Sequence, residues 1–446
     1  MKEKRTEKRI KIMNSIKNII SLAVLIIGLT VSAQQTPAPI QKEIVTIVGA
    51  TAHLGNGSVI ENSLIMFDNG KITVATDVNS TKIAYQGTII YAEGKHVYPG
   101  FIAPNTTLGL IEIDAVRPTR DDDELGDMIP NIRSIIAYNA ESKVVESMRP
   151  NGILIGQITP RGGTISGTSS IVQFDAWNWE DATVKTDDGI HLHWPSSYRR
   201  GRWWLGEPRG YKPNKNYKKD KEKIISFIAN SMAYGKSVPK KQNESFNAMQ
   251  GLFDGSQKMY VYANGEKEII DAITVLKESG VKNLVLVGGY ESHKVTSLLK
   301  SNQVSVLIQR VHTTPNFEDD DYDLTYKLAK LLVDDDVLVA LQTSGSMDRM
   351  NTRNLPFYAG QLVGQGMDKE TALQLITSNA AKILGIDKEY GTLEVGKSAT
   401  LFISEGDALD MRTNILTHAF IDGRTISLET HQTELWKRYM DKYSNK

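Results

Sequence analysis

The sequence predicts an α/β protein with a barrel-like middle and a smaller β-rich unit. Residues 99 to about 385 alternate β-rich runs with helical segments, which is the pattern of parallel βα units, and enough units are present to close a barrel. Residues 43–98 and about 389–427 read instead as short strands with turns, so the end of the chain could rejoin the first β unit. A length of 446 residues, 40% of them hydrophobic, suits one large domain plus a smaller one.

The first 33 residues are interpreted as a signal peptide. A start rich in Lys and Arg precedes the apolar run IISLAVLIIGLTVSA at 19–33, which ends in a small-x-small step, and we place cleavage after Ala33. An uncleaved anchor is the alternative, but the run is shorter than the ~20 residues of a membrane-spanning helix. Met13 is a second candidate start. The mature protein is therefore predicted to be exported, periplasmic or extracellular, with no stable membrane span.

Composition limits the chemistry and the partners. The chain has no cysteine, so disulfides, thiolate nucleophiles and Cys-ligated zinc are excluded. After removal of residues 1–33 the chain keeps 45 basic and 50 acidic residues, a net charge of −5. A nucleic-acid partner is therefore not predicted.

The elements follow in chain order. In the first β unit, Asn69-Gly70 predicts a hairpin turn. The middle holds β-rich runs such as GILIGQI, KMYVYAN, NLVLVGG, VSVLIQRV and VLVALQT, alternating with helical segments such as KEIIDAITVLKES and DLTYKLAKLLVD. Strands return in GTLEVGKSATLFISEGD and HAFIDGRTI, and the polar segment ETHQTELWKRYMDKY predicts a final helix.

Three motifs reach from one end of the mature chain to the other: VYPGFI at 97–102, MDKETALQLITSNAAKILGI at 367–386, and GTLEVGKSATLF followed by FIDGRTI. Together they resemble the amidohydrolase superfamily, and most closely its imidazolonepropionase-like secreted bacterial members. The resemblance implies a (β/α)8 TIM-type barrel at 99–385 and a composite β-sandwich formed by 34–98 and 386–446, the latter including the terminal helix. It also implies an active site at the C-terminal ends of the barrel strands.

The family's metal ligands have no counterparts at the positions that the resemblance aligns. Family members carry His-x-His on the first strand, two single histidines on later strands and an aspartate on the last, which together hold a metal that activates water. The corresponding residues of this chain are Asn105, Thr107, Tyr262, Gly288 and Ser344. We therefore predict a pocket of neutral groups at the former metal positions and no cofactor, with zinc as the alternative if the ligands are misassigned.

Three other histidines are candidate replacement ligands. His191 and His193 would share one face of a strand, but Trp194 and Pro195 suggest a packed loop away from the expected ligand positions, so a structural role is favoured. His312 follows an apolar strand and would sit at a barrel mouth, where a hydrogen-bonded loop histidine is the alternative. All three are fallback ligands.

Two further features are weak candidates for function. Arg353 follows the last barrel strand, where an arginine suits carboxylate recognition, and it joins His312 as a catalytic candidate. The segment 159–181, rich in Gly, Ser and Thr, is read as a substrate-side loop after the strand GILIGQI, or alternatively as a buried scaffold loop.

Two functions follow from these observations. Family resemblance implies hydrolysis of carbon–nitrogen bonds other than peptide bonds, using a metal or non-standard residues. Loss of the ligands instead favours a non-catalytic barrel that binds a small polar molecule, forms a homo-oligomer or pairs with a metal-dependent homologue. We favour the second, a candidate pseudoenzyme.

Overall fold

The computed structural model describes residues 36–80, 82–207, 210–236, 241–345 and 347–444. The chain divides into units 1–37 and 38–446, and every helix and strand given below belongs to the second. The predicted signal peptide and its cleavage point lie outside the described residues. Within the described part of the chain, no helix is both long and apolar enough to cross a membrane.

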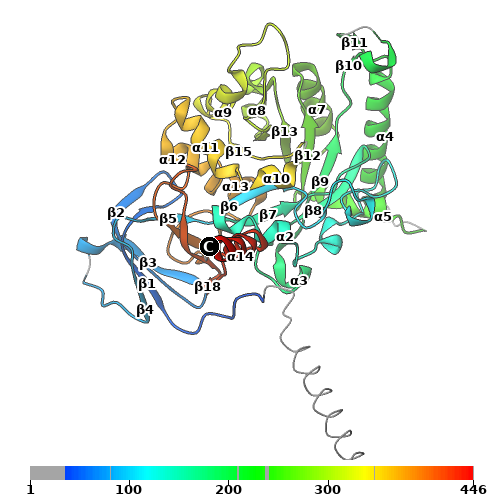
Figure 1. The fold of residues 1–446 in the computed structure, drawn as a ribbon. Coiled ribbons are helices and arrows are strands. Elements are labelled where there is room, and N and C mark those ends of the chain that lie inside the picture. Colours follow the sequence, from blue (N-terminus) through cyan, green and yellow to red (C-terminus); the bar gives the residue numbers. More distant parts are fainter. Residues whose placement is uncertain (1–35, 81, 208–209, 237–240, 346, 445–446) are drawn as a thin grey trace, which may run out of the picture. The chain divides into compact units, whose positions relative to one another are not determined.

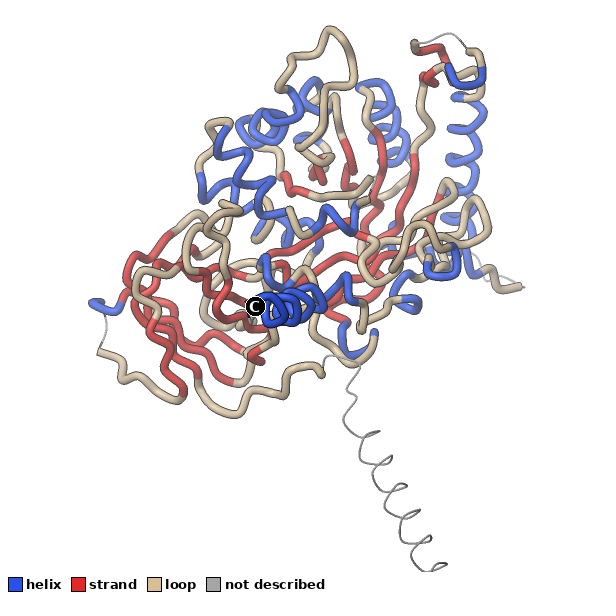
Figure 2. Tube along the Cα trace, viewed as in Figure 1, coloured by secondary structure: helices blue, strands red, loops and turns tan. Residues whose placement is uncertain are grey.

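The barrel is one eight-stranded sheet (Figures 1 and 2). Its strands, in spatial order, are β15 (Val339–Leu341), β14 (Ser305–Ile308), β13 (Leu284–Gly288), β12 (Lys258–Ala263), β9 (Thr183–His193), β8 (Ile165–Gln173), β7 (Ile153–Ile158) and β6 (Phe101–Thr106). β15 and β6 do not pair directly. The Leu341 amide donates to the Leu375 carbonyl (3.1 Å) and the Ile102 amide to the Ile376 carbonyl (2.9 Å), so residues 375–376 bridge the opening.

One strand departs from the predicted parallel pattern. β8 is antiparallel to both β7 and β9, and all nine of its residues are buried. The loop interpretation of 159–181 is therefore wrong for residues 165–173, because small Ser, Thr and Gly side chains also fit the crowded inside of a closed sheet. The first barrel strands also lack long crossover helices, since α2 (Lys143–Glu146) and α3 (Trp179–Ala182) have four residues each.

From β9 onward the expected alternation is present. Helices lie between successive parallel strands, along the outside of the sheet in Figure 2. The main ones are α4 (Tyr217–Gly235), α7 (Glu266–Glu278), α8 (Thr296–Ser301) and α9 (Leu324–Asp334); α11 (Leu355–Gly364), α12 (Lys369–Gln374) and α13 (Ser378–Leu384) follow β15, the last barrel strand along the chain. α7 and α9 each bury an apolar stripe, including Ile269, Ile273, Leu328 and Leu332, which is what their helical spacing predicts.

Both ends of the chain build the second sheet. Its order is β18 (Arg424–Thr425), β17 (Leu416–Ile421), β16 (Leu401–Ser404), β5 (His96–Pro99), β1 (Val45–His53), β2 (Val59–Asp68) and β3 (Lys71–Asp77), with β4 (Thr88–Tyr91) paired to β1. β5 and β16 are antiparallel partners, with Tyr98 opposite Phe402, so the two termini share one hydrogen-bonded sheet. The chain is therefore an α/β barrel with a composite β unit.

Two local predictions are also confirmed. Asn69 and Gly70 have φ values of 47° and 77° between β2 and β3, as a two-residue hairpin turn of this type requires. The polar C-terminal segment forms α14 (His431–Ser444), which has no buried residue.

Candidate functional site

A buried arginine occupies the C-terminal end of the barrel strands. Arg161 follows β7, and only 19% of its side chain is exposed. Its Nη1 donates to the Oδ1 of Asn105 (2.9 Å) and to the hydroxyl of Tyr262 (3.3 Å), and its Nη2 donates to the carbonyl of Asn105 (3.0 Å). Nη2 also lies 3.2 Å from the Oδ2 of Asp348, whose side chain is 8% exposed. A guanidinium therefore lies among residues taken from β6, β12 and the segment after β15.

The backbone at Asn105 allows this arrangement. Asn105 has a φ of 55°, in the left-handed region that asparagine tolerates better than most residues. This left-handed conformation occurs where the pairing of β6 with β7 is irregular. It lets the side-chain Oδ1 and the backbone carbonyl oxygen of Asn105 both accept hydrogen bonds from one guanidinium. The backbone N–H of Asn105 donates to Gln157 Oε1 (2.9 Å). A histidine at this position would meet backbone strain as well as a change of chemistry.

The charges of this network compensate each other. Burial lowers the pKa of Arg161, but Tyr262 and Asp348 outweigh burial and the pKa is raised, so the guanidinium stays charged. The Thr107 hydroxyl donates to Asp348 Oδ1 (2.6 Å), which leaves both carboxylate oxygens bonded. Burial raises the pKa of Tyr262 to about 12, against the lowering effect of Arg161. Around neutral pH the site is therefore a closed ion pair surrounded by neutral groups.

A chain of hydrogen bonds continues from Tyr262 into the barrel. The Tyr262 hydroxyl donates to Asn105 Oδ1 (2.6 Å) and lies 3.0 Å from His191 Nδ1. His191 Nε2 lies 2.8 Å from the hydroxyl of Ser169, which is 2.7 Å from Asp188 Oδ1. Burial, then Arg161 and His193, lower the pKa of His191 well below its usual value, and burial raises that of Asp188. Both ring nitrogens of His191 are thus engaged inside the barrel.

His193 is the more accessible histidine. It ends β9 opposite Tyr262, and the two rings stack with centroids 4.2 Å apart. Burial, followed by the charge of Arg161, lowers the pKa of His193 to about 4. An imidazole with this pKa is neutral and a weak base near pH 7, so it suits hydrogen bonding to a ligand better than proton transfer. The expectation that these histidines lie away from strand ends is wrong, because both lie near the C-terminal end of a barrel strand, although Trp194 is buried directly after it.

The structure brings together only some of the predicted pocket residues. Asn105 and Tyr262 are in direct contact, and Thr107 joins them through Asp348. The Ser344 amide donates to Gln342 Oε1 (2.6 Å), which also accepts from Asn105 Nδ2 at 3.5 Å, so Ser344 is linked only indirectly. Gly288 lies apart, where an added Cβ would be 2.5 Å from Asn264 Oδ1.

The prediction that only neutral groups fill this place is wrong. Arg161 supplies a cation there and Asp348 an anion, and neither had been selected from the sequence. The available signal was the arginine of TPRGG, directly after a strand's C-terminal end, together with an aspartate four residues beyond Ser344.

The other candidates lie elsewhere. His312 is exposed, near the rings of Tyr326 (6.0 Å) and Tyr358 (6.3 Å). Arg353 is also exposed, and its carbonyl accepts from Asn151 Nδ2 (2.6 Å). In the described ranges, no interaction joins either residue to the Arg161 network.

A divalent metal does not fit this arrangement. The Asn105 and Asp348 oxygens that face the centre already bind a fixed cation, and a second cation beside Arg161 would be repelled. Of the imidazoles and carboxylates that select transition metals, the Asp348 carboxylate is already paired with Arg161 and both ring nitrogens of His191 are engaged. Among the described residues, no group of three or more His, Cys, Asp or Glu side chains is placed to hold a metal ion.

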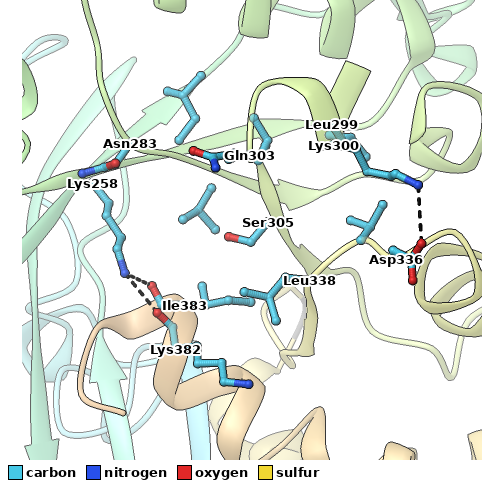
Figure 3. A pocket seen from close by; sticks show the side chains of 14 residues that line it. Lys258, Asn283, Leu299, Lys300, Gln303, Ser305, Asp336, Leu338, Lys382 and Ile383 are labelled. Carbon is cyan, nitrogen blue, oxygen red and sulfur yellow. Dashed lines mark hydrogen bonds and ion pairs between the residues drawn. The ribbon is translucent and has the colours of Figure 1, made fainter. Parts of the chain in front are cut away.

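A separate pocket of about 490 Å³ lies at the opposite ends of the strands, where β12, β13 and β14 begin (Figure 3). Lys258 points to the carbonyl oxygens of Lys382 and Ile383 at the end of α13, and Lys300 pairs with Asp336 (3.6 Å). Burial and the nearby Lys185 lower the pKa of Lys258 to about 8. Because barrel enzymes carry their chemistry at the other face, we assign this pocket a structural role.

Comparison with known proteins agrees with this fold. Residues 257–426 match the model of the amidohydrolase family. Over these residues the chain is similar to the amidohydrolase family. No curated protein matches the sequence.

Solved structures of amidohydrolase-superfamily proteins share the architecture. An amidohydrolase from Thermotoga maritima MSB8 has a TM-score of 0.74 at 21% identity, with 86% of this chain and 99% of that chain covered. A putative prolidase from Bifidobacterium longum has a TM-score of 0.55 at 14% identity, covering 91% and 99%. An adenosine deaminase from Xanthomonas campestris with bound zinc has a TM-score of 0.51 at 14% identity, covering 92% and 99%. At these identities the likeness concerns the fold.

Proposed function

We propose that this chain is a non-catalytic member of the amidohydrolase superfamily, which acts as a ligand-binding or partner subunit instead of hydrolysing carbon–nitrogen bonds with a metal. The observation that carries the proposal is the Arg161 guanidinium, bonded to Asn105, Tyr262 and Asp348 at the end of the barrel strands. In this proposal the Arg161 guanidinium is a permanent part of the chain. It supplies the positive charge that a bound metal supplies in active relatives.

The chemistry of the surrounding groups supports the same proposal. A metal-dependent hydrolase needs a metal-bound water and a group that accepts its proton. Here the Asp348 carboxylate is held by Arg161 and Thr107, and His193 has a pKa of about 4. What remains at the mouth is a set of hydrogen-bonding groups, His193, Tyr262 and Arg161, which suits a small, polar, uncharged ligand.

Metal content and zinc titration test the proposal. Purified mature protein should contain no stoichiometric transition metal by elemental analysis, and added zinc should bind weakly. The triple variant Asn105→His/Thr107→His/Tyr262→His should gain little zinc affinity while Arg161 is present. The same triple variant with Arg161→Met should bind zinc at least tenfold more tightly, because the competing cation is gone.

These two variants differ only at Arg161, so each is the control for the other, and urea denaturation of both records any loss of folding. Tight, stoichiometric zinc binding by the wild type would overturn the proposal. It would favour an active amidohydrolase that uses non-standard ligands, with His191 and His193 as the first to test.

A further inference from the structure

An arm beside the barrel mouth exposes an unusual group of large side chains. The arm consists of β10 (Tyr198–Arg200), the 3-10 turn Trp203–Leu205 and β11 (Tyr211–Pro213), with β10 and β11 paired antiparallel. Figure 1 draws it at the outer end of α4. Trp203, Trp204 and Leu205 are 58%, 64% and 62% exposed, and Tyr198 and Tyr211 about half. Clustered exposed aromatic and apolar side chains mark interaction surfaces, because leaving them in water is unfavourable.

The arm is strongly basic. The described residues of the arm, 198–207 and 210–213, contain four basic residues and one acidic residue, Glu207. Glu207 is already shared by Arg199 (3.3 Å) and Arg202 (2.9 Å). The exposed Arg200 and Lys212 add further positive charge. Tryptophan, tyrosine and arginine are the residue types most enriched at energetically important interface positions.

An acidic loop lies next to this arm. The segment 317–323, FEDDDYD, has five acidic and no basic residues, and Tyr322 is 81% exposed. Asp320 accepts hydrogen bonds from Tyr290 and from the Phe317 amide, which fixes the base of the loop, and Glu318 and Asp319 are exposed. The Phe317 ring contacts that of Tyr211 on the arm, with centroids 5.3 Å apart. Arm and loop therefore form one surface with a basic half and an acidic half.

A groove lies along this surface. It has a volume of about 680 Å³ and is lined by the aromatic residues Tyr198, Tyr211 and Phe317, by Lys267 and Ile270 of α7, and by the acidic residues Glu266, Glu268, Asp271 and Glu291. It can receive an apolar or aromatic side chain from a partner. The groove, the exposed tryptophans and the two charged halves together supply the apolar centre and charged rim of a protein interface.

We propose that the arm and the acidic loop form an isologous dimer interface, occupied by a second copy of this chain. A two-fold axis brings the same surface of both copies face to face, so the surface must complement itself. This one does, because rotation places the basic arm of each copy against the acidic loop of the other. A partner protein with only acidic residues at the contact would place negative charge against the acidic loop 317–323. The inference goes beyond the proposed function, since it does not depend on the barrel network.

Sedimentation velocity of the mature chain over a range of concentrations tests the dimer. The wild type should dimerise, and Trp203→Ser/Trp204→Ser should weaken dimerisation at least tenfold. Trp436→Ser is the matched control, because Trp436 is 62% exposed on α14, outside the arm, and its loss should change nothing. Circular dichroism confirms that each variant is folded.

A charge swap tests the pairing of arm with loop. The variant Arg200→Glu and the variant Glu318→Lys/Asp319→Lys should each dimerise much more weakly alone, because the new glutamate would face the acidic loop and the new lysines would face the basic arm. An equimolar mixture should form a heterodimer in which both contacts are again complementary, and this recovery should weaken as salt rises.

A wild type that stays monomeric up to its solubility limit would overturn the proposal. So would a dimer that survives loss of both tryptophans, or a mixture that does not recover. Zinc binding by the wild type would leave this proposal untouched while overturning the one for the barrel, so the two can fail separately.

Discussion

Replacing Arg161 by methionine tests the barrel network most directly. Methionine keeps much of the side-chain length but removes the charge and all five donors. Asp348 then loses its ion pair while only 8% exposed, and Asn105 loses two donors to its oxygens. Removing one partner of a buried ion pair costs about 3–5 kcal/mol, because the other charge stays buried without compensation. Since 19% of the Arg161 side chain is exposed, we expect the lower end, about 3 kcal/mol.

The measurement is the free energy of unfolding in urea at pH 7. Arg133→Met is the matched control, because Arg133 pairs with Asp187 at 2.8 Å but both side chains are more than a third exposed. That surface pair should contribute less than about 1 kcal/mol. The double variant Arg161→Met/Asp348→Asn should be more stable than the sum of its single changes predicts, because the unpaired charge is gone.

An NMR titration provides a second measurement on the same variant. Arg161 lowers the pKa values of both His191 and His193, so its removal should raise both, although burial still holds them below the ordinary value. An Arg161→Met protein within about 1 kcal/mol of the wild type would refute the network as described. Unchanged histidine pKa values would show that the guanidinium does not lie beside them.

Two further predictions concern the pH dependence of stability. His193 titrates at about 4 when folded and near 6.5 when unfolded, so the unfolded chain binds more protons between these values and stability falls as pH drops through this window. His193→Gln should therefore lose about 2 kcal/mol less stability than the wild type between pH 7 and pH 5 in urea denaturation, and equal losses would contradict the assignment. Lys258 has a folded pKa of about 8 against 10.5, so its buried charge opposes folding below pH 8 and stability rises above it. Relative to Lys258→Met, the wild type should gain about 2 kcal/mol between pH 8 and pH 10, and parallel pH profiles would show that the Lys258 ammonium is well solvated.

The residues at the barrel mouth show which parts of a functional site can be predicted from the sequence. The sequence predicts that Asn105, Thr107 and Tyr262 stand at the family's ligand positions, because the motif around each strand indicates its place. The partner of these residues is not visible there. Arg161 precedes β8, a strand that its sequence predicts to be a loop because Gly, Ser and Thr dominate its composition. His191 and His193 are predicted on a strand but away from the expected ligand positions, whereas β9, which carries them, pairs with β8 inside the barrel.

The sequence by itself determined the architecture: a composite β unit, a barrel between its halves and a polar final helix, because hydrophobic periodicity and turn residues are local properties of the chain. Only the tertiary structure decided the chemistry. Asn105, Arg161, Tyr262 and Asp348 lie up to 243 positions apart, and their contacts depend on strand order, on the left-handed backbone at Asn105 and on the direction of each side chain. The same holds for the pKa of His193, which burial and a distant arginine set, since an electrostatic environment belongs to the packed molecule and not to a stretch of sequence.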